Sequence, residues 1–207
     1  MLHRFSLFGC CALFVSQTLF AQSSGPLGID HRINFDESGV WRRGNQKAVE
    51  FGSAAFVVAG ALYEGNDSRL GKTFWKSLDA MVIGDVSSAV GKVAFRRQRP
   101  LDGNDPNAFF HNATDKSFPS GEMTHITAIV TPFIMEYAQE SPAAWGLSLL
   151  PVYVGVARMK SQAHWQSDIL AGGLLGAGAG YYAFHNDRNW SASLLPHGMT
   201  VGYKTRF

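Results

Sequence analysis

The sequence predicts an all-α protein, a helical bundle followed by a short β-hairpin at the C-terminus. Apolar runs of helical length follow one another between about residues 46 and 184, with almost no alternation of apolar and polar residues. This pattern is typical of helices packed on helices rather than of a sheet. At 207 residues, the chain is long enough for one domain with a substantial core.

The first 45 residues divide into two segments. Residues 1–21 have a short basic start, an apolar stretch and a small-residue exit at Ala21, which is the outline of a cleaved secretory signal peptide. The alternative, a membrane anchor, is weakened by the polar residues 16–18. We therefore expect an exported protein, periplasmic or associated with the cell envelope. The polar, turn-rich residues 22–45 are predicted to form an exposed arm.

Both cysteines, Cys10 and Cys11, lie inside the predicted signal peptide. The mature chain is then expected to contain no thiol. This expectation excludes disulfides, cysteine-ligated metals and cysteine nucleophiles together.

Five helices are predicted to form a domain over residues 46–186. The second must end before Pro100, because proline disfavours the helical conformation in the residue before it, and Gly84 is expected to kink it. The predicted helices span residues 46–63, 69–98, 121–139, 142–159 and 167–184, and a loop covers 100–118.

The tail, residues 187–207, has a different pattern. A Pro-His-Gly turn is followed by Met199, Val201 and Tyr203 alternating with polar or small residues, which predicts a β-hairpin. The terminal Phe207 also resembles the end of an outer-membrane strand. One hairpin cannot form a barrel, so an edge hairpin packed on the bundle is favoured.

Charge and hydropathy restrict the partners of this chain. A net charge of +2 argues against a nucleic-acid binder that works by bulk electrostatics. The mean hydropathy is −0.03, and polar residues interrupt most of the apolar runs. These features favour a soluble protein, or one with peripheral membrane contact, over a protein with six membrane spans.

Three polar clusters lie at predicted helix ends. In KVAFRRQRP, Lys92 and Arg99 are seven residues apart, so on one helix they would project from the same face. A solvated basic helix end is the simpler interpretation, and it accounts for Arg96 and Arg97.

The second cluster is Pro-Ser-Gly-Glu at the start of the third predicted helix. Ser120 is placed as an N-cap, and Gly121 would let an anion approach the free amides of the first turn. The alternative is an ordinary capped helix start, in which Glu122 gains from the helix dipole.

The third cluster contains Arg158, His164 and Asp168. His164 and Asp168 are four residues apart, so on a helix the carboxylate would lie one turn from the imidazole. An aspartate in that place can fix the tautomer of a histidine and raise its basicity.

Together the clusters describe a phosphoryl-transfer site. Lys92, Arg99 and Arg158 would neutralise the phosphoryl oxygens, Ser120 and the Gly121 amide would bind them, and His164 would attack phosphorus. Because lysine and arginine supply the positive charge, we expect no metal.

The three motifs, K-x6-R-P, P-S-G and R-x5-H-x3-D, resemble those of the type 2 phosphatidic acid phosphatase (PAP2) superfamily. This superfamily includes class A acid phosphatases and vanadium haloperoxidases. The resemblance covers about residues 90–170. It implies a phosphohistidine on His164 oriented by Asp168, with phosphate bound by Lys92, Arg99, Ser120, Gly121 and Arg158. It implies no cofactor, except vanadate in the haloperoxidase branch.

Two positions depart from the family pattern. Ala157 stands where the third motif usually has serine, and Glu122 stands where the second usually has the histidine that protonates the leaving oxygen. If its pKa is raised, Glu122 is the general acid. If not, a good leaving group such as a diphosphate needs little protonation, and His125 is a reserve candidate for the acid.

Three functions remain open on the sequence. The first is an exported phosphatase for a phosphomonoester or a lipid phosphate or diphosphate, with residues 109–118 at the rim selecting the substrate. The second is a non-catalytic protein that binds phosphate or a lipid headgroup. The third is a vanadate-dependent haloperoxidase. The oligomeric state is not indicated by the sequence.

Overall fold

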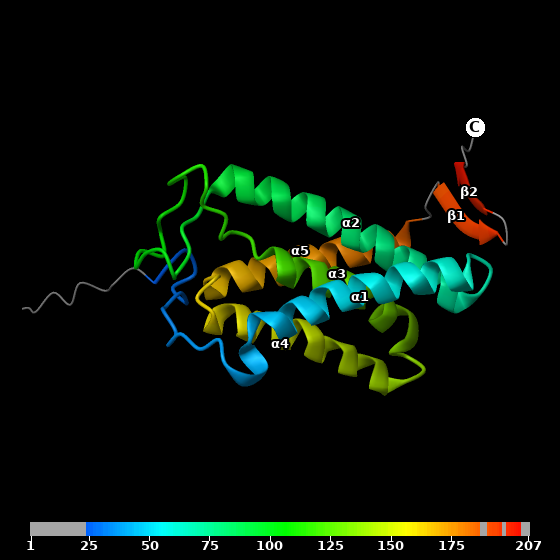
Figure 1. Ribbon diagram of the computed structural model, residues 1–207, viewed down its shortest axis with the longest axis horizontal. Coiled ribbons are helices and arrows are strands. Elements are labelled where there is room, and N and C mark those ends of the chain that lie inside the picture. Colours follow the sequence, from blue (N-terminus) through cyan, green and yellow to red (C-terminus); the bar gives the residue numbers. More distant parts are fainter. Residues whose placement is uncertain (1–23, 187–189, 196–197, 204–207) are drawn as a thin grey trace, which may run out of the picture.

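The protein, seen in a computed structural model, is described for residues 24–186, 190–195 and 198–203, so the predicted signal peptide lies outside the described residues. Figure 1 shows an elongated bundle of helices with two short strands at one end. The all-α prediction is confirmed. The helices are α1 (Arg43–Glu64), α2 (Arg69–Phe95), α3 (Gly121–Tyr137), α4 (Leu149–Lys160) and α5 (Gln166–His185), with 3-10 helices at Gly39–Trp41 and Pro142–Ser148.

Helix α3 is the central element, because it contacts each of the other four α-helices. Its apolar side chains meet those of α1, α2 and α4 in the main core, and burial of these side chains is the principal stabilising contribution. The core residues are Val57, Ala61, Phe74, Trp75, Ile126, Ile129, Val130 and Val154. A second cluster of small residues joins α2, α3 and α5, namely Ala80, Ala128, Ala179 and Ala183.

Helix α5 lies so close to α3 that glycine is required at the contact. A Cβ on Gly176 would lie 2.4 Å from the carbonyl oxygen of Thr124, and one on Gly172 would lie 2.5 Å from that of Ser120. Cβ atoms essentially never come this close to a non-bonded atom. This packing brings the start of α5 against the start of α3, where two of the polar motifs lie.

Helix α2 differs from its prediction at both points where the sequence indicated a break. It ends at Phe95 rather than near residue 98, because Arg96 adopts the left-handed conformation with φ of 41°. It runs without interruption through Gly84, where a Cβ would lie 3.1 Å from the Thr124 side chain. That glycine therefore permits close packing on α3 and does not break the helix.

The fourth predicted helix, 142–159, is two elements. A 3-10 helix covers Pro142–Ser148, and α4 begins only at Leu149. Pro151 lies in the first turn of α4, where its missing N–H leaves no hydrogen bond within the helix unmade.

The predicted hairpin is confirmed. Strands β1 (Trp190–Leu195) and β2 (Gly198–Tyr203) pair antiparallel, with Trp190 opposite Tyr203, and β1 contacts α1. In the part of the chain that the structure describes, no helix combines the length and the apolar character needed to cross a membrane.

The predicted arm is mostly exposed, but Asp30 is an exception. Its side chain is buried, and it accepts hydrogen bonds from the backbone N–H of Ser167 (2.7 Å) and from Arg97 (2.6 Å). The arm is therefore attached to the first turn of α5.

Candidate active site

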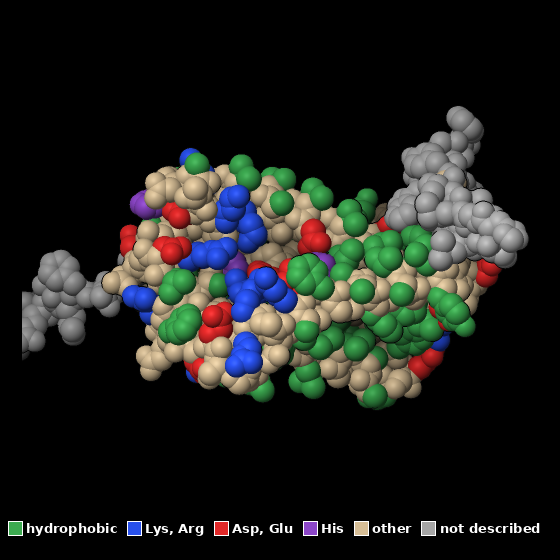
Figure 2. Space-filling model, in the orientation of Figure 1, with side chains coloured by type: hydrophobic (Ala, Val, Ile, Leu, Met, Phe, Trp, Pro, Cys, Tyr) green, Lys and Arg blue, Asp and Glu red, His purple; other side chains and the backbone are tan. Residues whose placement is uncertain are grey.

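The three motifs meet at one end of the bundle. The end of α2, the start of α3, the end of α4 and the start of α5 converge there, with the loop 96–120 beside them. In Figure 2, lysine and arginine side chains gather on this part of the surface, and histidine and acidic side chains are visible between them. The structure thus brings the predicted residues together.

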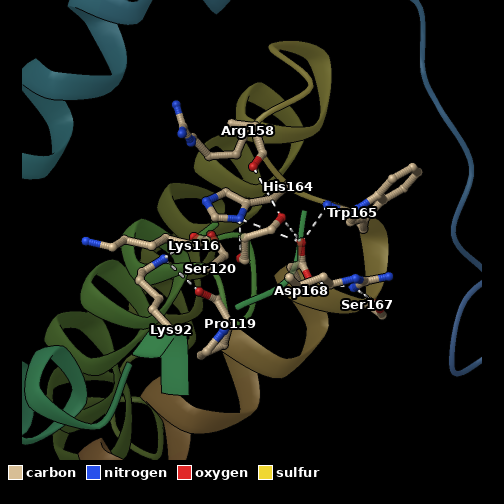
Figure 3. A network of polar contacts seen from close by, with 12 residues as sticks. Lys92, Lys116, Pro119, Ser120, Arg158, His164, Trp165, Ser167 and Asp168 are labelled. Atoms are coloured by element: carbon tan, nitrogen blue, oxygen red, sulfur yellow. Dashed lines mark hydrogen bonds and ion pairs between the residues drawn. The ribbon is translucent and has the colours of Figure 1, made fainter. Parts of the chain in front are cut away.

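The candidate nucleophile, His164, is buried in the turn between α4 and α5. Figure 3 shows its ring surrounded by Arg158, Ser120 and Lys92. The ring Nδ1 lies 2.7 Å from the carbonyl oxygen of Ser117. A carbonyl oxygen only accepts, so Nδ1 carries a proton, and in the neutral ring the lone pair is on Nε2. The structure therefore orients Nε2 as the atom that could attack phosphorus.

The partner that sets this tautomer differs from the prediction. Asp168 Oδ2 lies 3.8 Å from Nδ1, which exceeds a hydrogen bond, and His164 precedes the first residue of α5. The prediction that His164 and Asp168 lie one turn apart on the same helix was therefore wrong, because His164 belongs to the turn at residues 161–165. Asp168 acts on the ring by its charge, and the carbonyl of Ser117 holds the ring proton.

Asp168 is itself held firmly. Its oxygens accept from Arg97 (2.5 Å), from the Ser117 hydroxyl (2.5 Å) and from the backbone N–H of Trp165 (2.8 Å). Burial would raise the pKa of Asp168, but His164, Arg97 and the Ser117 hydroxyl together hold that pKa below its usual range. The side chain is therefore a carboxylate at neutral pH.

Arg97 is not the solvated basic residue that the sequence indicated. Its side chain is wholly buried and bridges two carboxylates, Asp30 at 2.6 Å and Asp168 at 2.5 Å. It also lies over the ring of Phe109, 4.6 Å from the ring centre. No signal in the sequence distinguished Arg97 from Arg96 and Arg99, which are only half-buried, because the partners of Arg97 come from distant segments.

The predicted phosphate-binding residues at the start of α3 lie around His164. Ser120 is the N-cap residue of α3 as predicted, but its hydroxyl makes no capping bond. A Cβ on Gly121 would lie 3.2 Å from Lys92 Cε, so the glycine leaves room for the lysine. Lys92 Nζ donates to the carbonyls of Pro119 (2.8 Å) and Lys116 (3.2 Å). Burial lowers the pKa of Lys92 to about 8, although the charge of Glu122 acts in the opposite direction.

Two arginines complete the predicted set. Arg158, near the end of α4, is buried and donates to the Gln46 side chain (3.1 Å). Arg99 lies in the loop after α2, so it does not share a helix face with Lys92 as predicted. Within the described residues, the Arg99 guanidinium makes no hydrogen bond or ion pair, and it is only half-buried.

Three buried polar atoms in this cluster have no hydrogen-bond partner in the described part of the chain: His164 Nε2, Ser120 Oγ and Arg158 Nε. Buried polar atoms are rarely left without a partner, so this convergence indicates a place built for a polar ligand. A nucleophilic nitrogen beside a hydroxyl, a guanidinium and an ammonium group suits a phosphoryl group.

Glu122 lies directly against the candidate nucleophile. Its Oε2 is 3.4 Å from His164 Nε2, and its Oε1 is 3.0 Å from Arg43 and 3.5 Å from Arg158. Burial would raise the pKa of Glu122, but His164 and Arg158 outweigh burial and hold the pKa well below its usual range. The structure thus gives the direction of the Glu122 pKa shift, which the sequence left open.

Two further residues of the site, Arg43 and Gln46, were not predicted from the sequence. Both lie on α1, which carries no recognisable motif.

His125, the reserve candidate for a general acid, faces a different partner. Its Nδ1 lies 2.9 Å from Asp85 on α2. Burial would lower the pKa of His125, but Asp85 and Glu50 outweigh it and raise the pKa. His125 is therefore more readily protonated than an ordinary histidine, and its contacts are with the α1 and α2 side of the site.

The model of the PAP2 superfamily matches residues 73–191, more than half of the chain. A lipid A 1-phosphatase of Porphyromonas gingivalis is 30% identical over 125 residues, which cover 59% of this chain and 26% of that protein. This chain therefore spans about a quarter of the length of that relative.

A crystal structure of Aquifex aeolicus LpxE covers 68% of this chain and 84% of its own, with 16% identity and a TM-score of 0.47. The family match includes all three motifs and every predicted site residue. The chain belongs to the PAP2 superfamily.

Proposed function

We propose that the protein is a phosphatase that hydrolyses a lipid phosphate or diphosphate, or another phosphomonoester, through a phosphohistidine on His164. The observation that carries this proposal is that His164 Nε2, Ser120 Oγ and Arg158 Nε, three buried atoms of one cluster, have no hydrogen-bond partner in the described chain. A relative that is a lipid A 1-phosphatase supports a phosphorylated lipid as the substrate. Export to the cell envelope, as residues 1–21 indicate, is part of the same proposal.

The chemistry follows from the positions of the side chains. Nε2 of His164 attacks phosphorus, the bond to the leaving oxygen breaks, and water then attacks the phosphohistidine to release inorganic phosphate. Lys92, Arg99 and Arg158 offset the charge on the phosphoryl oxygens, so positive charge is supplied by side chains.

The leaving oxygen receives little help from Glu122. A carboxyl group whose pKa is below its usual range is ionised at neutral pH and has no proton to donate. We therefore expect diphosphate substrates, whose leaving group is already a weak base, to be hydrolysed faster than simple alkyl phosphates.

Phosphate release by the mature chain tests the proposal, measured with a lipid diphosphate and with an aryl phosphate, with and without chelator. His164→Ala should abolish release, and an acid-labile phosphoryl group should be trapped on wild type but not on this variant. The matched control is His185→Ala, an exposed histidine near the far end of α5. Undiminished release by His164→Ala would contradict the mechanism. Phosphate binding without turnover at any pH would favour a non-catalytic binding protein.

A further inference from the structure

Nε2 of His164 is buried, although it must reach phosphorus in the proposed reaction. Reacting atoms approach to about 3–3.5 Å before a bond forms. An oxygen of Glu122 already lies 3.4 Å from Nε2. The carboxylate and an incoming phosphorus would therefore occupy the same shell around the nucleophile.

The other contacts of Glu122 are those of a bound anion. Its second oxygen lies between two guanidinium groups, Arg43 at 3.0 Å and Arg158 at 3.5 Å. Arg158 is one of the residues expected to bind the phosphoryl oxygens. The Glu122 carboxylate thus contacts both His164, the proposed nucleophile, and Arg158, which is expected to bind the phosphoryl group.

The protonation of the ring leads to the same conclusion. Nδ1 of His164 donates to the Ser117 carbonyl. If Nε2 also carries a proton, it can donate to Glu122 but cannot attack. If Nε2 has a lone pair, two acceptors face each other, which is unfavourable. In both states, attack requires Glu122 to leave.

We propose that Glu122 is an internal competitor for the phosphoryl group, one that covers His164 until a phosphorylated ligand displaces it. This inference rests on the proposed function, because it assumes that the ligand binds beside His164. Once displaced from His164 and Arg158, the carboxylate keeps Arg43 of α1 as its partner. Glu122 thereby sets how strongly a phosphate group must bind to enter the site.

The test is isothermal titration calorimetry of the mature chain with inorganic phosphate at pH 7.5. Glu122→Gln keeps the shape of the side chain but removes the charge that holds it over His164. We expect the Kd for phosphate to fall by about tenfold, because a larger fraction of the molecules is open to the ligand. Glu122→Ala should also bind more tightly, and the unfolding temperature of each variant without ligand checks that it folds.

Glu50→Gln is the matched control. The Glu50 carboxylate lies 3.9 Å from the same Arg43 nitrogen, but its contact is with Arg43 rather than with His164. If loss of negative charge near the site were sufficient, Glu50→Gln would tighten phosphate binding as much as Glu122→Gln, and the inference would be wrong. An unchanged Kd in Glu122→Gln would also overturn it while leaving the phosphatase proposal intact. Failure of wild type and all variants to bind phosphate would overturn both.

Discussion

At the scale of single residues, burial decides which charges the site can use. Lys92 is a cation whose pKa burial lowers to about 8, whereas Glu122 and Asp168 are carboxylates whose pKa values are held down by neighbouring cations. The charge of the proposed phosphate-binding cluster therefore changes near pH 8 through the lysine, while the two carboxylates stay ionised at neutral pH.

Phosphate binding should weaken as the pH rises through 8. With a pKa of about 8, Lys92 of the unliganded protein is about one-tenth protonated at pH 9. The apparent affinity for inorganic phosphate should therefore fall about tenfold between pH 7.5 and 9. Calorimetric titration at these pH values measures it. Lys92→Arg, whose guanidinium stays protonated, should show a much smaller change. Equal pH dependence in both proteins would contradict the assignment of Lys92.

At the scale of elements, two contacts place α5, and with it Asp168. One is the close packing of its glycines on α3, and the other is the attachment of the N-terminal arm through Asp30. Both lie outside the motifs, yet both hold the start of α5 where His164 and Asp168 are needed.

Gly176→Ala should force α5 away from α3. The new Cβ would lie 2.4 Å from the Thr124 carbonyl, and overpacking of this kind costs about 1–3 kcal/mol of unfolding free energy. Urea denaturation measures the loss, and phosphate release should fall with it. Gly178→Ala is the control on the same helix, since its Cβ meets nothing within 4 Å. It should be neutral or slightly stabilising, because alanine favours a helix over glycine.

Asp30→Asn should destabilise the protein through Arg97. It removes one of the two carboxylates that offset a wholly buried guanidinium, a change that costs about 3 kcal/mol. A lower midpoint of urea unfolding is the expected result. Glu37→Gln, at an exposed position of the arm, serves as the control and should leave the midpoint almost unchanged. If the two variants unfold alike, the buried pair contributes nothing to stability.

At the scale of the whole molecule, the exposed side chains are distributed unevenly along the bundle. On the face drawn in Figure 2, exposed apolar side chains gather toward the end that carries the strands, and most lysine and arginine side chains gather toward the other. Because the net charge is only +2, the attraction for an anion comes from the local arrangement of cations and not from the total charge.

Inorganic phosphate should therefore stabilise the folded chain against heat. A ligand that binds only the native state at 100 times its Kd adds about 2.7 kcal/mol to the free energy of unfolding. Thermal unfolding followed by circular dichroism should show a rise in Tm with phosphate and a much smaller rise in Arg158→Ala. The comparison uses the shift caused by phosphate, so a lower starting Tm of the variant does not affect it. Equal shifts would remove Arg158 from the binding site.

The helices, the hairpin and the members of the site could be predicted from sequence, because they depend on local patterns and on the order of three motifs. Lys92, Ser120, Arg158 and His164 do lie together. Boundaries were predicted less well, since α2 ends before the left-handed Arg96 and a 3-10 helix replaces the first part of the fourth predicted helix.

The tertiary structure alone decided how these residues are charged and partnered. The burial of Arg97, the Ser117 carbonyl on His164 and the Arg43 contact of Glu122 all join segments distant in sequence. A pKa depends on burial and on neighbours, neither of which a linear motif contains. The sequence by itself determined that the chain carries the three motifs and has a glutamate directly after Pro-Ser-Gly. Only the fold determined that the pKa of this carboxyl group is lowered and that the group lies 3.4 Å from Nε2 of His164, because both depend on contacts between distant segments.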